Sequence, residues 1–309
     1  MNILQTHIKN YLIFCKLQKC LDSKTIKSYK IDLTQFSQII HEEYVSNISI
    51  DTLETFIGFL HQTYKPKTVK RKIATIKAFF HYLEYKNILS VNPFDKIQIK
   101  FREPVILPKT IPLNIIEQFL KTLYIQHTRA KSEYQKYKTL QNIAIIELLF
   151  STGIRISELC SLKNCDVNLS NNTILIFGKG SKERILQIGN EEVVNILQKY
   201  KNFFLNKTKN STYFFTSQSG HPISDQSIRR MIKKYSELAG IDLHITPHMF
   251  RHTFATSLLE SDVDIRYIQE MLGHSSINIT EIYTHVTVSK QKDILKNKHP
   301  RKNFKIQIK

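Results

Sequence analysis

The stretch NTILIFGKGSKERILQIG, residues 172–189, interrupts a helical pattern that holds on both sides of it. Ile174 and Ile176 repeat at every second residue, which is typical of a half-buried strand. Gly178 and Gly180 follow and predict a tight turn into a second strand. We therefore expect a mainly α fold that contains a small antiparallel β-hairpin or sheet.

Upstream of this hairpin, the first hundred residues show helical spacing. Ser23 is a suitable N-cap for KTIKSYKIDLTQFSQII and Asp51 for DTLETFIGFLHQT, while Pro66 stands in the first turn of PKTVKRKIATIKAFFHYLEY. We expect this part of the chain to form a helical domain. In the last stretch the apolar residues fall on one stripe, which consists of Val69, Ile73, Ile76, Phe80 and Leu83.

A linker is predicted where the helical spacing stops. Residues 101–112, FREPVILPKTIP, hold three of the eight prolines and show no helical period. At 309 residues and 41% hydrophobic, the chain is long enough for two ordinary domains. We expect one domain over 1–100, the linker over 101–112, a second domain over 113–290 and a tail over 291–309.

The charge of the chain points to a polyanionic partner. Lys and Arg number 45 against 26 Asp and Glu, which gives a net charge of +19. An excess of this sign attracts nucleic acid. A compositional bias toward lysine would produce the same excess, so the charge alone leaves both explanations open.

The cysteines and the apolar runs indicate a cytoplasmic setting. Cys15 with Cys20 and Cys160 with Cys165 are spaced too widely for a zinc knuckle, so no metal site is expected. The chain starts without a signal-peptide pattern and contains no apolar stretch near membrane length. We expect reduced thiols and a cytoplasmic, DNA-associated protein with no membrane partner.

Two segments carry basic side chains at helical spacing. LLFSTGIRISELCSLK, residues 148–163, breaks at Gly153 and places Glu158 one turn after Arg155, where it can orient the guanidinium. TPHMFRHTFATSLLE, residues 246–260, puts three polar side chains on one helix face, which we expect to point away from the core. The three are His248, Arg251 and His252. Taken alone, these are also ordinary features of solvated helices.

A third segment, DIRYIQEMLGHSSINITEIYTHV, spans residues 264–286. Its first helix is predicted to stop at Gly273, which suits a left-handed C-cap, and His274 follows at once. Tyr283 lies nine positions beyond His274. A tyrosine in such a position is by itself most often a buried core residue.

Taken in order, TGIRISEL, a lysine in the hairpin, HMFRH, LGHSS and YTH closely resemble the tyrosine recombinase (phage integrase) family, and within it the bacterial Xer-like branch. The resemblance covers roughly the whole chain. It implies a helical, SAM-like core-binding domain and a catalytic domain that close on DNA as a C-shaped clamp. The implied catalytic residues are Arg155, Lys179, His248, Arg251, His274 and Tyr283, with Glu158 and His252 in support.

The chemistry of these side chains suits metal-free phosphodiester exchange. Arg155 and Arg251 can bind phosphate oxygens bidentately, where a nuclease would use a metal ion. Tyr283 must lose its proton as it attacks, and His248 is the predicted acceptor. The predicted general acid for the leaving 5′-oxygen is Lys179, with Lys182 as its rival. We expect no metal ion, ATP or other cofactor, because the phosphotyrosine conserves the bond energy.

The predicted partner is double-stranded DNA that carries paired recombination sites. The resemblance implies a homo- or hetero-tetramer on DNA, with a partner recombinase or a DNA translocase as a further possibility. Phe304, Ile306 and Ile308 alternate in the tail and predict an edge strand, which docks either within its own chain or on a neighbour. The predicted DNA contacts are Lys67, Lys70, Arg71, Lys77, Lys182 and Arg184.

Three other functions stay open at this stage. A type IB topoisomerase would share the tyrosine chemistry, and a catalytically silent protein of the same fold would bind DNA without cutting it. A metal-dependent nuclease built on the histidine cluster would lose its activity in EDTA, which should not affect the metal-free mechanism. Within the recombinase interpretation, the sequence does not distinguish chromosome partition by dimer resolution from DNA integration or inversion.

Overall fold

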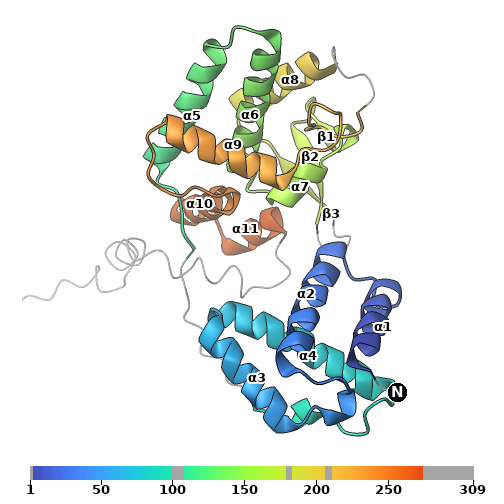
Figure 1. The fold of residues 1–309 in the computed structure, drawn as a ribbon. Coiled ribbons are helices and arrows are strands. Elements are labelled where there is room, and N and C mark those ends of the chain that lie inside the picture. The colour runs from blue at the N-terminus through green and yellow to red at the C-terminus, as the bar shows by residue number, and fades with distance from the viewer. Residues whose placement is uncertain (1–2, 99–107, 179–182, 206–210, 274–309) are drawn as a thin grey trace, which may run out of the picture. The chain divides into compact units, whose positions relative to one another are not determined.

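The computed structural model describes residues 3–98, 108–178, 183–205 and 211–273, and the chain divides into two compact units, Met1–Val105 and Ile106–Lys309 (Figure 1). No helix in the described part of the chain is long and apolar enough to cross a membrane. Four predicted site residues and the tail, residues 291–309, lie outside the described residues. The four are Lys179, Lys182, His274 and Tyr283.

The first unit is built from helices, as predicted. They are α1 (Leu4–Leu17), α2 (Ser23–Ile40), α3 (Ile50–Thr63) and α4 (Pro66–Tyr85), with short 3₁₀ turns at Val45–Asn47 and Pro93–Lys96.

The N-cap of α2 lies one residue before the predicted one, and the N-cap of α3 lies two residues before it. Asp22, not Ser23, caps α2: its Oδ1 accepts hydrogen bonds from the amides of Lys24 and Thr25, and its Oδ2 accepts one from the Thr25 hydroxyl. Ser49, not Asp51, caps α3 by accepting from the Thr52 amide. Asp51 instead lies in the first turn of α3, where a negative charge also favours the helix.

The core of the first unit is centred on the apolar stripe of α4. All of the predicted stripe residues are buried, and aromatic rings from three other helices and from the turn at 93–96 pack around them. Phe36 of α2 lies edge-on to Phe56 of α3 at 4.9 Å between ring centroids, and Phe80 lies edge-on to Phe94 at 5.3 Å. The predicted spacing of α4 is therefore confirmed.

The second unit contains seven helices and a small sheet within its described residues. The helices are α5 (Leu113–Thr128), α6 (Glu133–Thr152), α7 (Ile156–Ser161), α8 (Glu191–Leu205), α9 (Asp225–Leu238), α10 (Pro247–Glu260) and α11 (Ile265–Leu272), with a 3₁₀ turn at Asn164–Asp166. The strands β1 (Val167–Asn168), β2 (Thr173–Phe177) and β3 (Glu183–Gln187) form an antiparallel sheet in the order β1-β2-β3. This confirms the predicted mainly α fold with its small antiparallel sheet.

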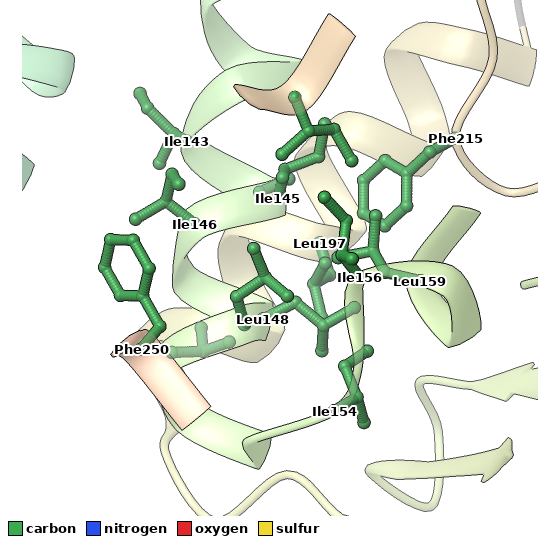
Figure 2. Close-up of a cluster of buried hydrophobic side chains, with 14 of the residues drawn as sticks. Ile143, Ile145, Ile146, Leu148, Ile154, Ile156, Leu159, Leu197, Phe215 and Phe250 are labelled. Carbon is green, nitrogen blue, oxygen red and sulfur yellow. The ribbon is translucent and has the colours of Figure 1, made fainter. Parts of the chain in front are cut away.

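Helix α6 is the centre of the second unit. Ile143, Ile145, Ile146 and Leu148 are each fully buried although they point in different directions around the helix axis, so other elements pack on every side of it (Figure 2). Figure 2 shows Phe250 of α10 on one side and Leu197 and Phe215 on another. The end of α6 is therefore held firmly, and the residues that follow it start from a fixed point.

Gly153 ends α6 in a left-handed conformation, with φ +62°. A Cβ atom there would meet Phe254 Cδ1 at 2.5 Å and Leu272 Cδ2 at 3.0 Å. Both the backbone angle and the close approach of α10 and α11 therefore require glycine. With no side chain in the way, these two helices lie directly against the turn that leads into α7.

Candidate active site

Arg155 occupies the N-cap position of α7, and Glu158 follows in its first turn. The Arg155 amide donates to Glu158 Oε2 at 2.8 Å, and its guanidinium Nη1 donates to Oε1 at 2.8 Å. Both contacts agree with the predicted orienting role of this carboxylate. The Arg155 side chain remains 32% exposed, so its guanidinium is held in place and still faces solvent.

Arg251 is buried in α10 and is only 4% exposed. The helical wheel predicts that it points away from the core together with His248 and His252, and for Arg251 this is wrong. The reason is that its partners are main-chain carbonyls of other elements. Its Nη1 donates to the Gly153 oxygen at 2.8 Å, and its Nη2 donates to the Leu272 oxygen at 2.8 Å.

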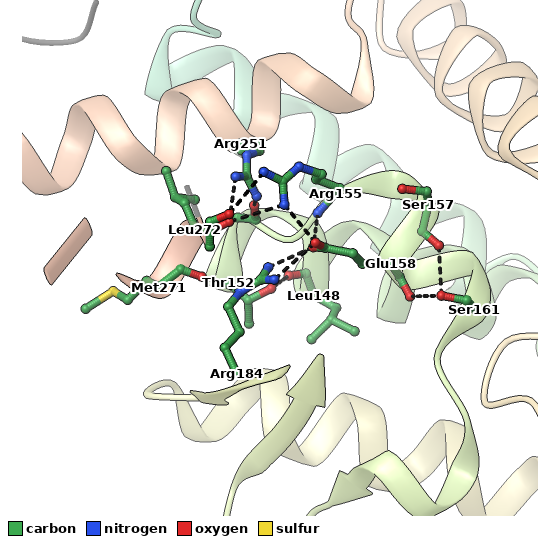
Figure 3. A network of polar contacts seen from close by, with 12 residues as sticks. Leu148, Thr152, Arg155, Ser157, Glu158, Ser161, Arg184, Arg251, Met271 and Leu272 are labelled. Carbon is green, nitrogen blue, oxygen red and sulfur yellow. Dashed lines mark hydrogen bonds and ion pairs between the residues drawn. The ribbon is translucent and has the colours of Figure 1, made fainter. Parts of the chain in front are cut away.

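The two arginines converge on one atom. Arg155 Nη1 also reaches the Leu272 oxygen, at 3.4 Å, and its Nη2 reaches the Gly273 oxygen at 3.4 Å (Figure 3). Two guanidinium groups from different helices thus lie within reach of the same oxygen. We refer to Arg155 and Arg251 as the arginine pair. Such a pair concentrates positive charge and directed donors at one point, which is what a phosphate requires.

Arg184 of β3 is one of the predicted DNA contacts, but its side chain is nearly buried and bonded within the second unit. Its Nη1 and Nη2 donate to the two carboxylate oxygens of Glu158, at 3.1 and 2.7 Å, and its Nε donates to the Met271 oxygen at 2.8 Å. The side chain is 10% exposed. A guanidinium with these partners and so little exposure does not fit the predicted contact with DNA. The register that pairs Arg184 with Ile176 turns it toward the buried side of the sheet.

Glu158 stays ionised in this setting. Burial of its side chain raises the pKa of the carboxyl, but the hydrogen bonds from Arg184 and Arg155 outweigh that effect, so the pKa lies below its ordinary value. A single carboxylate, 5% exposed, therefore pairs with two arginines and offsets one of their two positive charges.

His248 lies at the surface beside the arginine pair. The protein around it lowers the pKa of its imidazole, and the positive charges of Arg229 and Arg251 lower it further. The imidazole is therefore neutral near pH 7 and can accept a proton, as its predicted role demands. Burial lowers the pKa of His252 to about 4, with smaller effects from His248 and Arg251.

The predicted DNA contacts of the first unit lie on one helix. Lys67, Lys70, Arg71 and Lys77 of α4 are all exposed, as expected for residues off the apolar stripe. Arg71 forms an ion pair with the buried carboxylate of Asp32 in α2.

Lys72, which the sequence did not single out, is 4% exposed and donates to Asp32 Oδ1 at 3.1 Å. The signal for it was present in the sequence. Lys72 stands three residues after Val69 and four before Ile76, and therefore falls on the apolar stripe.

Comparisons with known proteins agree with this geometry. Residues 118–290 match the phage integrase family, and residues 8–87 match the N-terminal SAM-like domain of phage integrases. A tyrosine recombinase of Agathobacter rectalis is 69% identical over 304 residues, which cover 98% of this chain and 99% of that protein. The tyrosine recombinase XerD of Listeria monocytogenes is 34% identical over 303 residues, or 95% of this chain and 98% of that protein.

A solved structure has the same fold. The site-specific recombinase XerH, bound to its palindromic difH substrate in a post-cleavage complex, superposes with a TM-score of 0.74 at 24% identity. The match covers 92% of this chain and 82% of XerH.

Proposed function

Since the chain belongs to the phage integrase family, the tyrosine recombinases, we propose that it cleaves and rejoins DNA at specific sites through a covalent 3′-phosphotyrosyl intermediate on Tyr283. The observation that carries this proposal is the convergence of Arg155 and Arg251 on a single oxygen atom. A phosphodiester resists attack because it is negative, and two guanidinium groups aimed at one point neutralise the charge that develops on it.

The cleavage step is a displacement at phosphorus. The Tyr283 oxygen forms a bond to phosphorus as the bond to the 5′-oxygen breaks, and His248 takes the phenolic proton. The low pKa of the His248 imidazole supports this role, because the base must be unprotonated before the attack. Lys179, or its rival Lys182, gives a proton to the departing 5′-oxygen. His274 adds a third donor to the phosphate.

The rejoining step is the same reaction in reverse. A 5′-hydroxyl attacks the phosphotyrosine, the phosphodiester forms again and Tyr283 recovers its proton. Since one phosphoester bond replaces another throughout, the reaction needs no ATP. When the attacking hydroxyl comes from a second duplex, the product is a recombinant.

We further propose that the chain acts as a tetramer, of one or two kinds of subunit, on a synapsed pair of sites, with its two domains around each duplex. Strand exchange between two duplexes requires four cleavages, one for each protomer. Chromosome partition is one role that such exchange serves, beside DNA integration. The tail, residues 291–309, is a candidate link between protomers, and a chain ending at residue 290 would show whether synapsis depends on it.

The test is trapping of the covalent intermediate. A duplex is first selected from a randomised pool by binding to the protein, and nicks are then placed at successive positions so that cleavage becomes irreversible. Incubation in EDTA followed by a denaturing gel shows any protein–DNA adduct. We expect an adduct with the wild type and none with Tyr283→Phe. Tyr267→Phe is the matched control, because Tyr267 is an exposed tyrosine of α11.

Three outcomes would contradict the proposal. An adduct that persists in Tyr283→Phe would place the nucleophile elsewhere. Binding of the selected duplex without an adduct at any nick position would favour a silent DNA-binding protein. Relaxation of supercoiled plasmids that lack the selected sequence would instead favour a type IB topoisomerase.

A further inference from the structure

We infer that Arg184 of β3 is a positioning residue for the arginine pair, and that it acts through Glu158 and the end of α11 without touching DNA. The inference rests on the proposed function, because it concerns how the phosphate-binding groups of that site are held. Its basis is that one nearly buried guanidinium joins three elements, β3, α7 and α11, which are distant in the sequence (Figure 3).

The first contact fixes Glu158. Arg184 donates to both oxygens of this carboxylate through a fork of two hydrogen bonds, which allows only one orientation of the carboxylate plane. The same two oxygens accept the amide and the guanidinium of Arg155. Any rotation of Glu158 would therefore break its bonds to Arg155, so Arg184 determines where Arg155 points.

The second contact fixes the end of α11. Arg184 Nε donates to the Met271 oxygen at 2.8 Å, and the guanidinium packs against Gly273. A Cβ atom on Gly273 would meet Arg184 Nη1 at 2.9 Å, and its backbone has φ +64°. Gly273 thus leaves room for the arginine as well as ending the helix.

Both contacts of Arg184 act on the groups around the Leu272 oxygen. The Leu272 oxygen, on which both members of the arginine pair converge, lies between the Met271 oxygen and Gly273 in the chain. Arg184 therefore holds Arg155 from one side and the last turn of α11 from the other. Loss of Arg184 would free both at once, and the distances between donor groups and phosphate would no longer be fixed.

The experiment compares single-turnover adduct formation on the selected, nicked duplex at saturating DNA. Arg184→Met removes the donors and keeps a stem that fills part of the space, whereas Arg184→Lys keeps the charge. We expect the methionine variant to be about 10- to 100-fold slower, with unchanged affinity for the duplex. The lysine variant should recover part of the rate. The matched control is Arg266→Met, an arginine of α11 that is 83% exposed, which should cleave like the wild type.

A double variant separates positioning from simple loss of stability. If Arg184 acts through Arg155, then Arg184→Met should slow an Arg155→Ala protein by less than about threefold, because its target is already gone. If Arg184→Met slowed the Arg155→Ala protein by the same factor as the wild type, the inference would be overturned. If Arg184→Met does not fold, Arg184→Lys carries the same test, because it should slow the Arg155→Ala protein by a smaller factor than it slows the wild type.

A modified substrate tests whether Arg184 acts instead through the proposed general acid, Lys179 or Lys182. Sulfur in place of the 5′-bridging oxygen gives a leaving group that needs no proton. The Arg184→Met protein should remain slow on this duplex, and recovery of the wild-type rate would show that Arg184 serves the general acid. Failure of the wild type to form an adduct would contradict the proposed function, whereas equal rates for wild type and Arg184→Met would contradict this inference alone.

Discussion

Each unit of the molecule contains one buried carboxylate that holds two basic side chains. In the second unit, Glu158 is 5% exposed and pairs with Arg184, at 10%, and Arg155, at 32%. In the first unit, the Asp32 side chain is 0% exposed. It pairs with the side chains of Lys72, which is 5% exposed, and of Arg71, which is 47% exposed. In both units, the carboxylate pairs with one partly exposed guanidinium, that of Arg155 or Arg71. The second cation, Arg184 or Lys72, is nearly buried.

The difference lies in what else the cations contact. Lys72 reaches Gln35 and lies 4.9 Å from the centroid of the Tyr64 ring, so its contacts stay between neighbouring helices. Arg155 shares the Leu272 oxygen with Arg251, a third cation from another helix. The first arrangement presents a single charge, which suits contact with a DNA backbone. The second concentrates charge at a point, which suits chemistry on one phosphate.

Arg155→Ala is the strongest test of this contrast. We expect cleavage to slow by about 10²- to 10³-fold with DNA binding largely intact, by analogy with the loss of one oxyanion donor. Arg71→Ala should do the opposite, weakening binding while the single-turnover rate at saturating DNA is unchanged. Adduct formation and gel-shift affinity measured on both variants give the comparison. A normal cleavage rate for Arg155→Ala would contradict the proposal that the arginine pair binds the phosphate.

Asp32→Asn tests whether the ion pairs of Asp32 with Lys72 and Arg71 stabilise the first unit. We expect it to destabilise that unit by about 3 kcal/mol, because the buried Lys72 ammonium loses its counter-charge. Hydrogen exchange of the α2 and α4 amides in the full chain measures the effect locally. Adding Lys72→Met should restore much of the loss. Unchanged exchange rates in Asp32→Asn would mean that the pair contributes little to stability.

The pH dependence of cleavage tests the role of His248. Since the pKa of its imidazole lies below 6.5, the rate should be flat near neutrality and fall only as the pH drops through that lowered pKa. Arg229→Met removes a positive charge that lowers this pKa, so the fall should move toward neutral pH. A fall centred near pH 4 that Arg229→Met does not move would point to His252 as the base.

Single alanine substitutions at Lys67, Lys70 and Lys77 should have the smallest effects. Each removes one phosphate contact, so affinity should weaken equally for all DNA sequences and the salt dependence, d log K/d log[salt], should change by about 0.9. Cleavage at saturating DNA should not change. Lys9→Ala, an exposed lysine of α1 in the same unit, is the control. If Lys9→Ala changed the salt dependence as much, α4 would not be the contact surface.

Much of this molecule follows from the sequence alone. The stripe from Val69 to Leu83 fixed one face of α4, and the period-two alternation of Ile174 and Ile176 located the sheet, because side-chain periodicity follows directly from helix and strand geometry. The sequence did not locate the helix boundaries to the residue, since Asp22 and Ser23, or Ser49 and Asp51, are all chemically suitable caps. The order of the motifs was enough to identify the family.

The tertiary structure decided where the arginines point. A helical wheel gives the direction of Arg251 but not what lies in that direction, and Arg184 in a strand gives no hint of its partner. Their partners are the main-chain oxygens of Gly153, Met271 and Leu272. Every residue carries such an oxygen, so a carbonyl that binds an arginine leaves no mark in the sequence, and only the packing of α6, α10 and α11 brings these carbonyls within reach.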